Sequence, residues 1–288
     1  MDNILQHWNV SGEPVTLIYK SAHNSTWNIG DKYILKNNPN AEQLSRNIHL
    51  ANLLAAQNIP AVTYIKTING EWTAPDKTYC LMEKIKGEHI DFYASPEIIR
   101  ELGRGLARLH TALSEIEPEL QCHDNNFLVE WRDYIKPGLV GVSDSLAEQT
   151  ENRLFSLYGK LPRGPIHRDV HSQNVLFCDG KITGWLDFDL NRKDVRVFDL
   201  AYLLAGLLVG RIDDSQKIKE WKNIYRELLT GYDEVNTLTA DERKALPILM
   251  IAIELLFVTY FGSMGKDEER DKANALAEWL HKNCRGDY

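Results

Sequence analysis

The sequence predicts an α+β protein built from two lobes: a small N-terminal lobe with an antiparallel sheet and one helix, and a larger, mainly helical C-terminal lobe. Positions 15–82 hold short runs that alternate between apolar and polar residues, with one amphipathic run among them. From residue 95 onward, longer runs with helical spacing dominate. With 288 residues, of which 43% are hydrophobic, the chain is long enough for a sizeable core.

The N-terminal lobe is expected to end at residue 83. Its single helix is predicted at 42–57, where Leu44, Ile48 and Ala51 recur at the spacing of one helical face and Pro60 follows the end. The strands are expected at residues 15–19, 27–29, 33–36, 62–68 and 78–82, with turns at 29–32 and 69–70.

A hinge is expected at 84–88, where charged residues and a glycine interrupt the apolar runs, and the C-terminal lobe is expected over 89–288. Ser95 followed by Pro96 is typical of a helix N-terminus, and this helix should run to about Leu113. The remaining helices are predicted at 131–134, 146–158, 199–208, 218–232, 239–261 and 267–283.

Charge and composition exclude several partners. The formal net charge of −8 argues against binding of bulk nucleic acid or of an anionic lipid surface. Four scattered cysteines without metal-site spacing indicate free thiols in a reducing compartment. The N-terminus resembles no signal peptide, and the apolar run 246–261 contains Pro247 and Glu254 and is too short to span a bilayer. We therefore expect a soluble cytoplasmic protein with a buried helix at this run.

One segment contains residue types that are typical of a catalytic site. Residues 166–177 form a polar loop, rich in His, Asp and Asn, that enters an apolar strand. A turn at Asp179 and Gly180 returns the chain into a second strand that ends at Asp187. We expect this ribbon to bring Asp169, Asn174 and Asp187 toward one point.

Those three residues are what phosphoryl transfer requires. One carboxylate can orient the attacking hydroxyl and accept its proton, while an amide oxygen and a second carboxylate can hold Mg²⁺. The order of His167, Arg168 and Asp169, with Asn174 five residues after the aspartate and Asp187 before Phe188, matches a pattern known from kinases.

The sequence resembles the family of aminoglycoside phosphotransferases and choline kinase-like enzymes, small-molecule kinases with a protein-kinase-like fold. Further support comes from the helical run 102–110 and from Asp199, Leu200 and Ala201. The resemblance implies that Asp169 is the catalytic base and that Asn174 and Asp187 bind Mg²⁺. It also implies that His167 and Asp199 brace the loop and that ATP or GTP is the phosphate donor.

The nucleotide side is expected in the N-terminal lobe. By the same resemblance, Lys36 at the end of a strand contacts the α- and β-phosphates. Backbone amides of the loop 21–26, with Ser25 or Thr26, are expected to cover the phosphates. Backbone groups of Met82, Glu83 and Lys84 are expected to read the purine edge; Met82 is also a candidate core residue.

One departure from the family occurs in the N-terminal helix. The family's lysine-pairing glutamate corresponds here to Asn47. Glu42 lies about 140° away around the helix, whereas Gln43 lies on nearly the same face as Asn47. Lys36 is therefore expected to have a neutral partner, unless Glu42 reaches it from a shifted helix start.

The acceptor is expected to be a small molecule. Only twelve positions separate Asp187 from Asp199, too few for the activation segment of a protein kinase. Pocket candidates are Asp189, Asp194, Trp131 and Glu254, and acidic residues would suit a cationic alcohol. Amino sugars, choline, homoserine and thiamine all remain open as acceptors, and a monomer or homodimer is expected. The main alternative is a non-catalytic nucleotide-binding regulator.

Overall fold

The computed structural model describes residues 1–21, 24–93, 95–120, 122–124 and 126–284. The chain divides into two compact units. The first unit comprises Met1–His89, Pro118–Gln121 and Val175–Asp189, and the second comprises Ile90–Glu117, Cys122–Asn174 and Leu190–Tyr288. The hairpin that carries Asp187 thus belongs with the N-terminal strands, whereas the loop that carries Asp169 belongs to the helical unit.

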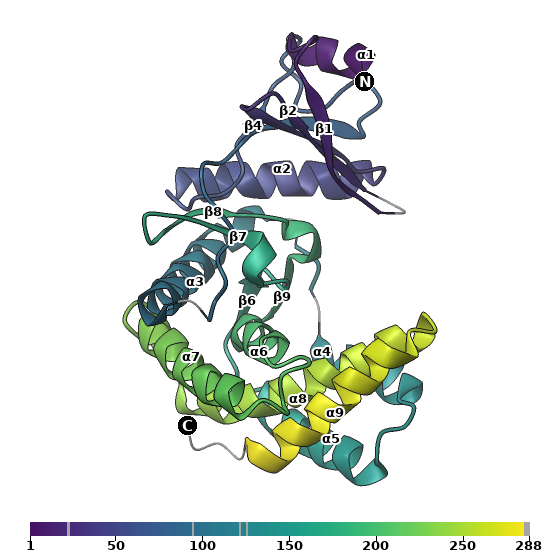
Figure 1. The fold of residues 1–288 in the computed structure, drawn as a ribbon, viewed down its shortest axis with the longest axis vertical. Coiled ribbons are helices and arrows are strands. Elements are labelled where there is room, and N and C mark those ends of the chain that lie inside the picture. The colour runs from purple at the N-terminus through teal and green to yellow at the C-terminus, as the bar shows by residue number, and fades with distance from the viewer. Residues whose placement is uncertain (22–23, 94, 121, 125, 285–288) are drawn as a thin grey trace. The chain divides into compact units, whose positions relative to one another are not determined.

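A five-stranded antiparallel sheet in the order β1-β2-β3-β5-β4 forms the core of the first unit. Helix α2 lies along this sheet (Figure 1). The elements of this unit are α1 (Asp2–Leu5), β1 (Val15–Lys20), β2 (Ser25–Ile29), β3 (Tyr33–Asn37), α2 (Ala41–Ala56), β4 (Tyr64–Ile65), β5 (Tyr79–Glu83), β7 (Val175–Cys178) and β8 (Lys181–Trp185).

Strand alternation explains where Lys36 points. Leu35 and its cross-strand partner Leu81 pack on one face of the sheet, with Leu5 and Trp8. Lys36 and its partner Cys80 lie on the opposite face, where Cys80 packs with residues of α2. The alternation of strand residues therefore places the Lys36 ammonium on the α2 side.

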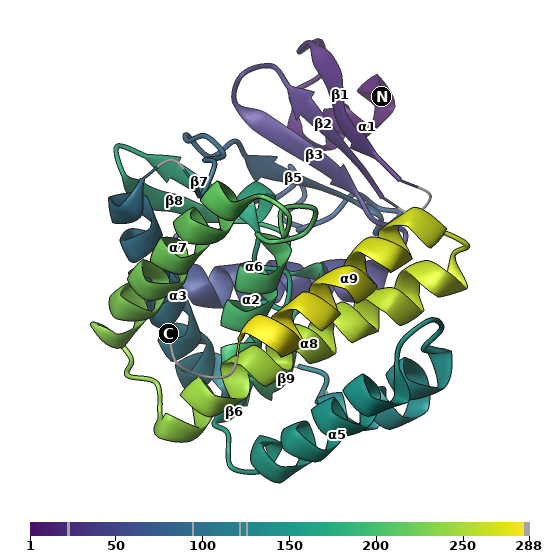
Figure 2. The same ribbon diagram turned by 60° about the horizontal axis from the view of Figure 1, so that its bottom comes forward.

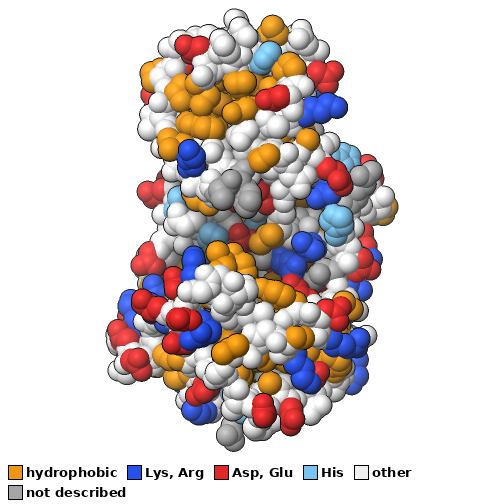
Figure 3. Space-filling model, turned by 90° about the vertical axis from the view of Figure 1, so that its right-hand side faces the viewer, with side chains coloured by type: hydrophobic (Ala, Val, Ile, Leu, Met, Phe, Trp, Pro, Cys, Tyr) orange, Lys and Arg blue, Asp and Glu red, His pale blue; other side chains and the backbone are white. Residues whose placement is uncertain are grey.

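Strand β1 leaves apolar side chains exposed. Leu17, Ile18 and Tyr19 are each more than half exposed, and β1 is an edge strand of the sheet. Hydrophobic side chains gather on the part of the molecule that carries the N-terminal strands (Figure 3). The predicted strand 62–68 shrinks to β4 with two residues, because Thr67 turns the chain by bonding to Glu71.

The second unit consists mostly of helices. Helix α3 packs against α7, and α8 packs against α6 and α9 (Figures 1 and 2). Its elements are α3 (Pro96–Ile116), α4 (Phe127–Glu130), a π-helical turn (Trp131–Ile135), α5 (Asp144–Tyr158), β6 (Arg163–Ile166), β9 (Arg192–Val195), α6 (Val197–Gly206), α7 (Ser215–Asp233), α8 (Ala240–Ser263) and α9 (Asp267–Asn283).

Most predicted helices occur, with ends moved by capping residues. Asn40 caps α2 and Thr239 caps α8, each by accepting a backbone N–H through its side chain. Helix α8 is long and apolar enough to cross a membrane, but 72% of its most apolar window is buried inside the protein, as expected of a core helix. The antiparallel pair β6–β9 was not predicted from the sequence.

The four cysteines are free thiols, which confirms the prediction made from their scattered positions. The turn between β7 and β8 is also confirmed. Asp179 and Gly180 both have positive φ angles, of 50° and 71°, which is the geometry of the tight hairpin turn that favours this residue pair.

Candidate active site

The carboxylate of Asp169 is held at both oxygens. The Tyr202 hydroxyl donates to Oδ1 at 2.7 Å, and the Asn174 side-chain Nδ2 donates to Oδ2 at 3.0 Å. His171 Nε2 lies 3.5 Å from Oδ2. Tyr202 comes from α6, whereas the other two residues belong to the loop itself, so a distant helix and the local turn together orient this carboxylate.

The same contacts set the ionisation of Asp169. Burial raises the pKa of this carboxyl, but hydrogen bonds from His171 and Tyr202 outweigh burial and hold the pKa below its ordinary value. Burial and the neighbouring Asp169 in turn raise the pKa of Tyr202, so this tyrosine stays a hydrogen-bond donor. Asp169 is therefore ionised throughout the neutral range.

A buried aspartate anchors the loop that carries Asp169. Asp199 is fully buried and accepts the backbone N–H groups of His167 at 2.9 Å and of Arg168 at 2.7 Å. Its Oδ2 also lies 2.9 Å from His110 Nε2, and His110 Nδ1 lies 2.8 Å from the Tyr232 hydroxyl. The buried charge is thus satisfied by several polar contacts, which fix the backbone of the loop.

His167, expected among the catalytic residues, is fully buried. Its Nδ1 accepts the backbone N–H of Asp169 at 3.3 Å. Arg168 beside it has a φ of 70°, a strained conformation for a side-chain-bearing residue. This placement gives His167 a part in holding the loop.

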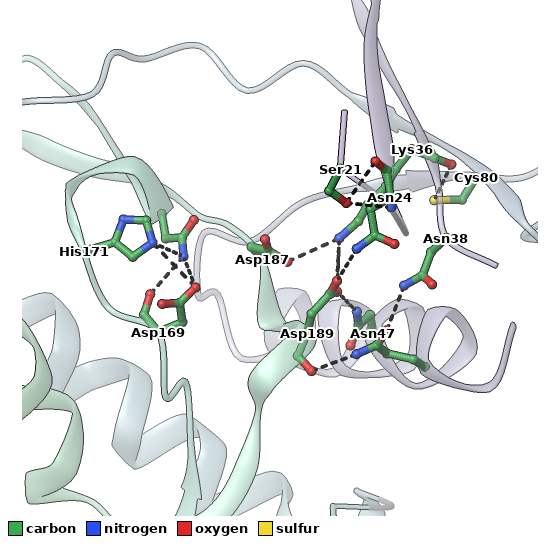
Figure 4. Close-up of polar contacts among 12 residues, drawn as sticks. Ser21, Asn24, Lys36, Asn38, Asn47, Cys80, Asp169, His171, Asp187 and Asp189 are labelled. Carbon is green, nitrogen blue, oxygen red and sulfur yellow. Dashed lines mark hydrogen bonds and ion pairs between the residues drawn. The ribbon is translucent and has the colours of Figure 1, made fainter. Parts of the chain in front are cut away.

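In the first unit, Lys36 is paired with two aspartates. Its Nζ lies 3.2 Å from Asp187 Oδ1 and 3.0 Å from Asp189 Oδ1 (Figure 4). Burial alone lowers the pKa of this ammonium, but the two carboxylates outweigh burial and raise it. Burial and the repulsion from Asp187 raise the pKa of Asp189, which Lys36 opposes. The positive charge of Lys36 thus offsets part of the negative charge of Asp187 and Asp189.

Asp189 supplies the negative charge that a glutamate at position 47 would otherwise supply to Lys36. Asn47 Nδ2 donates to Asp189 Oδ1, and Gln43 Nε2 donates to the Asp189 backbone carbonyl at 3.0 Å. Helix α2 therefore holds an aspartate that pairs with Lys36, instead of supplying the carboxylate itself. Glu42 pairs with Arg46 at 2.8 Å and does not reach Lys36. The expectation of a neutral partner for Lys36 is wrong, because two carboxylates after β8 fill that position.

Two backbone amides of the residues expected to read the purine edge already have acceptors. Met82 is buried in the cluster between α2 and the sheet. The N–H of Glu83 donates to the Thr63 carbonyl and that of Lys84 to the Lys32 carbonyl. Neither amide is free to donate to a base. The first backbone amide after them without an acceptor among the described residues is that of Ile85.

Ser25 and Thr26 open strand β2, where Thr26 is the cross-strand partner of Lys36. Before them, the Ser21 N–H donates to the Asn24 carbonyl at 2.8 Å, and the Asn24 N–H donates to the Ser21 hydroxyl at 2.9 Å. Positions 22 and 23 of the expected phosphate loop lie outside the described residues.

The two expected metal ligands belong to different units, Asn174 to the second and Asp187 to the first. Asn174 turns its Nδ2 toward Asp169 and His171, and no donor among the described residues reaches its Oδ1. The Asp187 side chain is 47% exposed, and its backbone has a φ of 58°. The residues that the structure describes contain no group of three His, Cys, Asp or Glu suited to a metal ion. Taken singly, the Asn174 Oδ1 and the Asp187 carboxylate each offer an oxygen of the kind that Mg²⁺ takes, and Mg²⁺ usually takes one or two protein oxygens together with substrate phosphates and water.

A pocket of about 390 Å³ lies wholly within the second unit. Val170, His171 and Ser172, the residues that follow Asp169, form part of its wall, and Tyr202 forms another part. Of the four acceptor-site candidates, only Glu254 lines this pocket. Trp131 is a core residue, and Asp194 is buried with the Tyr158 hydroxyl 2.5 Å from its carboxylate.

Tyr202 was not identified from the sequence as a partner of Asp169, and the backbone amide of Ile85 was not singled out. Tyr202 could have been found from helical spacing, because it lies three residues after Asp199 in the same helix. The Ile85 amide could not, because its availability depends on which carbonyls the two preceding amides contact.

Comparison with known proteins gives a consistent result. The model of the phosphotransferase enzyme family matches residues 15–236. A homoserine kinase from Polaromonas naphthalenivorans is 28% identical over 225 residues, covering 73% of this chain and 68% of that protein. One from Hyphomonas neptunium is 31% identical over 172 residues, covering 55% of this chain and 51% of its own length. The chain thus spans only about half the length of the second relative.

Solved structures share the fold. An amicoumacin kinase in complex with AMP-PNP, Ca²⁺ and Ami is 16% identical, with a TM-score of 0.76, and the match covers 98% of this chain and 92% of that one. A microcompartment-associated aminopropanol kinase is 18% identical, with a TM-score of 0.71, over 97% of this chain and 94% of that one. These likenesses confirm the predicted kinase-like fold.

Proposed function

Because the chain belongs to the phosphotransferase enzyme family, we propose that it transfers the γ-phosphate of ATP or GTP to a hydroxyl group of a small molecule. The observation that carries this proposal is the state of Asp169: an ionised carboxylate, oriented at both oxygens, on a loop that lines a small-molecule pocket. That is the arrangement a hydroxyl acceptor requires.

Lys36 is the proposed phosphate ligand. Its ammonium is held by Asp187 and Asp189, so it is charged and positioned before a nucleotide arrives. A bound phosphate would replace part of this pairing, while Asn47 and Gln43 would keep Asp189 in place. We propose the Ile85 backbone amide as the donor to the purine edge.

Asn174 and Asp187 are the proposed holders of Mg²⁺, through the Asn174 Oδ1 and an Asp187 carboxylate oxygen. The metal, when bound, screens the negative charge of the phosphates. Asp187 has a second neighbour in Lys36, so its carboxylate is shared between an ammonium and the cation.

Asp169 acts on the acceptor. It accepts a hydrogen bond from the acceptor hydroxyl and takes the proton late, as the hydroxyl oxygen bonds to the γ-phosphorus. The bond from that phosphorus to the bridging oxygen breaks at the same centre, and the nucleoside diphosphate leaves with the electron pair. A carboxylate with a low pKa is a weak base, which suits a step in which positioning matters more than proton abstraction.

The pocket limits the acceptor to a small molecule. A volume of about 390 Å³ holds a ligand the size of an amino acid or a sugar, and the relatives named above phosphorylate homoserine, aminopropanol and amicoumacin. We propose an acceptor in this size range. We also propose that the enzyme works in the cytoplasm, without nucleic acid or membrane, as a monomer or homodimer.

A screen of nucleotide hydrolysis and transfer tests this function. ADP release would be followed with Mg²⁺ and ATP across homoserine, aminopropanol, choline, thiamine and amino sugars, for the native chain and for Asp169→Asn. The proposal expects release above the no-acceptor rate with at least one alcohol, and loss of that increment in the variant. Nucleotide binding with no transfer to any alcohol would favour a regulator.

A further inference from the structure

The middle of α8 places a carboxyl group inside the pocket. Glu254 is 1% exposed and forms part of the pocket wall, beside Tyr202 and Phe257. The Tyr202 hydroxyl, which lines the same pocket, donates to Asp169 and not to Glu254. Buried acids in proteins are normally paired or hydrogen-bonded, because desolvation of an unpaired charge is costly. Neither the fold nor the proposed chemistry accounts for this one.

The groups around the pocket do not neutralise Glu254. From the elements packed around it come Tyr202, Asp91, Glu269, His171, Arg211 and Lys272. Burial alone raises the pKa of Glu254 to about 8, with no compensating contribution from a cation. At neutral pH without a ligand, the carboxyl is therefore mostly protonated.

Tyr202 connects Glu254 to the candidate base. It lines the same pocket, its hydroxyl bonds to Asp169, and both Asp169 and Glu254 contribute to its raised pKa. A ligand that contacts Glu254 therefore lies in the pocket whose wall includes the partner of Asp169.

We propose that Glu254 recognises a protonated amine on the acceptor, which makes the acceptor an amino alcohol. This inference rests on the proposed function, since it takes the pocket to be the acceptor site. The other pocket carboxylate from the C-terminal helices, Glu269, is exposed to water and needs no partner. Glu254 is buried, so a cation gains most by pairing with it.

Binding of an amine to Glu254 should release a proton. The amine enters as an ammonium ion, and the Glu254 carboxyl releases its proton to the buffer, leaving a carboxylate–ammonium pair in the pocket. At pH 7, close to one proton should be released for each ligand bound, because the carboxyl is mostly protonated beforehand. A neutral alcohol of the same shape would release none.

Calorimetry on the full chain tests this without relying on phosphoryl transfer. Homoserine and 1-amino-2-propanol would be titrated at pH 7 in PIPES and in Tris, which have different ionisation enthalpies, in the presence of AMP-PNP and Mg²⁺. Their counterparts without the amine, 4-hydroxybutyrate and 1,2-propanediol, would be titrated in parallel. We expect proton release with at least one amine and with neither counterpart.

Glu254→Gln keeps the shape of the protonated side chain. We expect it to weaken amine binding by about 10- to 100-fold and to abolish the proton release, with little change for the counterparts. Glu148→Gln, an exposed change of the same kind on α5, serves as the control.

Three results would overturn the inference: no binding of either amine to the native chain, binding without proton release, or equal weakening of amines and counterparts in Glu254→Gln. The proposed function fails separately. If the amine binds with proton release but ADP is never released, Glu254 keeps its role and the transfer proposal is wrong. If transfer proceeds and Glu254→Gln leaves the preference for amines intact, only the inference about Glu254 is wrong.

Discussion

The two units hold their central acids in different ways. In the first unit, Asp187 and Asp189 are compensated by the charge of Lys36. In the second, Asp169 is compensated mainly by hydrogen bonds from Tyr202, Asn174 and His171, with the loop fixed by Asp199. Under the proposed function, the first arrangement would exchange partners when phosphate binds at Lys36, whereas the carboxylate of Asp169 is already oriented at both oxygens. Nucleotide binding and acceptor activation should therefore separate by mutation.

The largest effect is expected from Asp187→Ala. Because this carboxylate is both the proposed metal ligand and a partner of Lys36, its loss should remove Mg²⁺-dependent ATP binding and lower turnover by about 10³-fold or more. Calorimetric titration with ATP, with and without Mg²⁺, measures this. Native affinity for Mg²⁺-ATP in the variant would refute the metal role.

Stability as a function of pH should reveal Glu254. Its pKa is raised in the folded chain, so the native state loses stability as pH rises from about 4.5 to about 8. Glu254→Gln has no proton to lose. In urea unfolding without ligand, the free energy of unfolding of the variant, measured relative to that of the native chain, should therefore rise by about 2–3 kcal/mol between pH 6 and pH 8.5. If the difference in unfolding free energy between the two proteins does not change with pH, the Glu254 carboxyl is solvated.

The carboxylate that pairs with Lys36 can be moved by mutation from position 189 to position 47 on α2. Asp189→Asn should lower turnover by about 10-fold, because Lys36 loses one of its two carboxylate partners. Adding Asn47→Glu should restore most of that loss by returning the charge to α2, whereas Asn47→Glu alone should impair turnover. The double-mutant cycle measures this coupling. Simple additivity of the two changes would show that Asn47 and Asp189 do not compensate each other.

A smaller effect is expected from Tyr202→Phe. Loss of its hydroxyl removes a bond that lowers the pKa of Asp169, so this pKa should rise. The acid side of the pH–rate profile should move to higher pH, with turnover at pH 7 reduced by about 3- to 10-fold. An unchanged profile would show that the tyrosine does not act through Asp169.

Local patterns in the sequence identified what local structure determines. The β7–β8 turn followed from Asp179 and Gly180, and the helices predicted to begin at residues 42 and 239 begin within one residue of those positions, as α2 and α8. Asp169 and Asn174 meet because five residues of one loop separate them. These relations need only the neighbouring chain, so the sequence predicts them.

Relations between distant segments could not be predicted in this way. Asp189 lies 153 residues from Lys36, and no local pattern shows that this carboxylate, rather than a residue of α2, pairs with the lysine. The carbonyls that occupy the amides of Glu83 and Lys84 come from Thr63 and Lys32. Each depends on strand register and loop path, which tertiary packing decides.

Asp169→Asn tests the central claim most directly, since one purified variant reports on both units. It keeps the shape of the side chain and removes its charge. With the acceptor found in the screen, turnover should fall by about 10²- to 10⁴-fold while Mg²⁺-ATP binding stays within about threefold of native, because Lys36 and Asp187 are untouched. Near-native turnover, or loss of ATP binding together with turnover, would contradict the assignment of Asp169 to the acceptor.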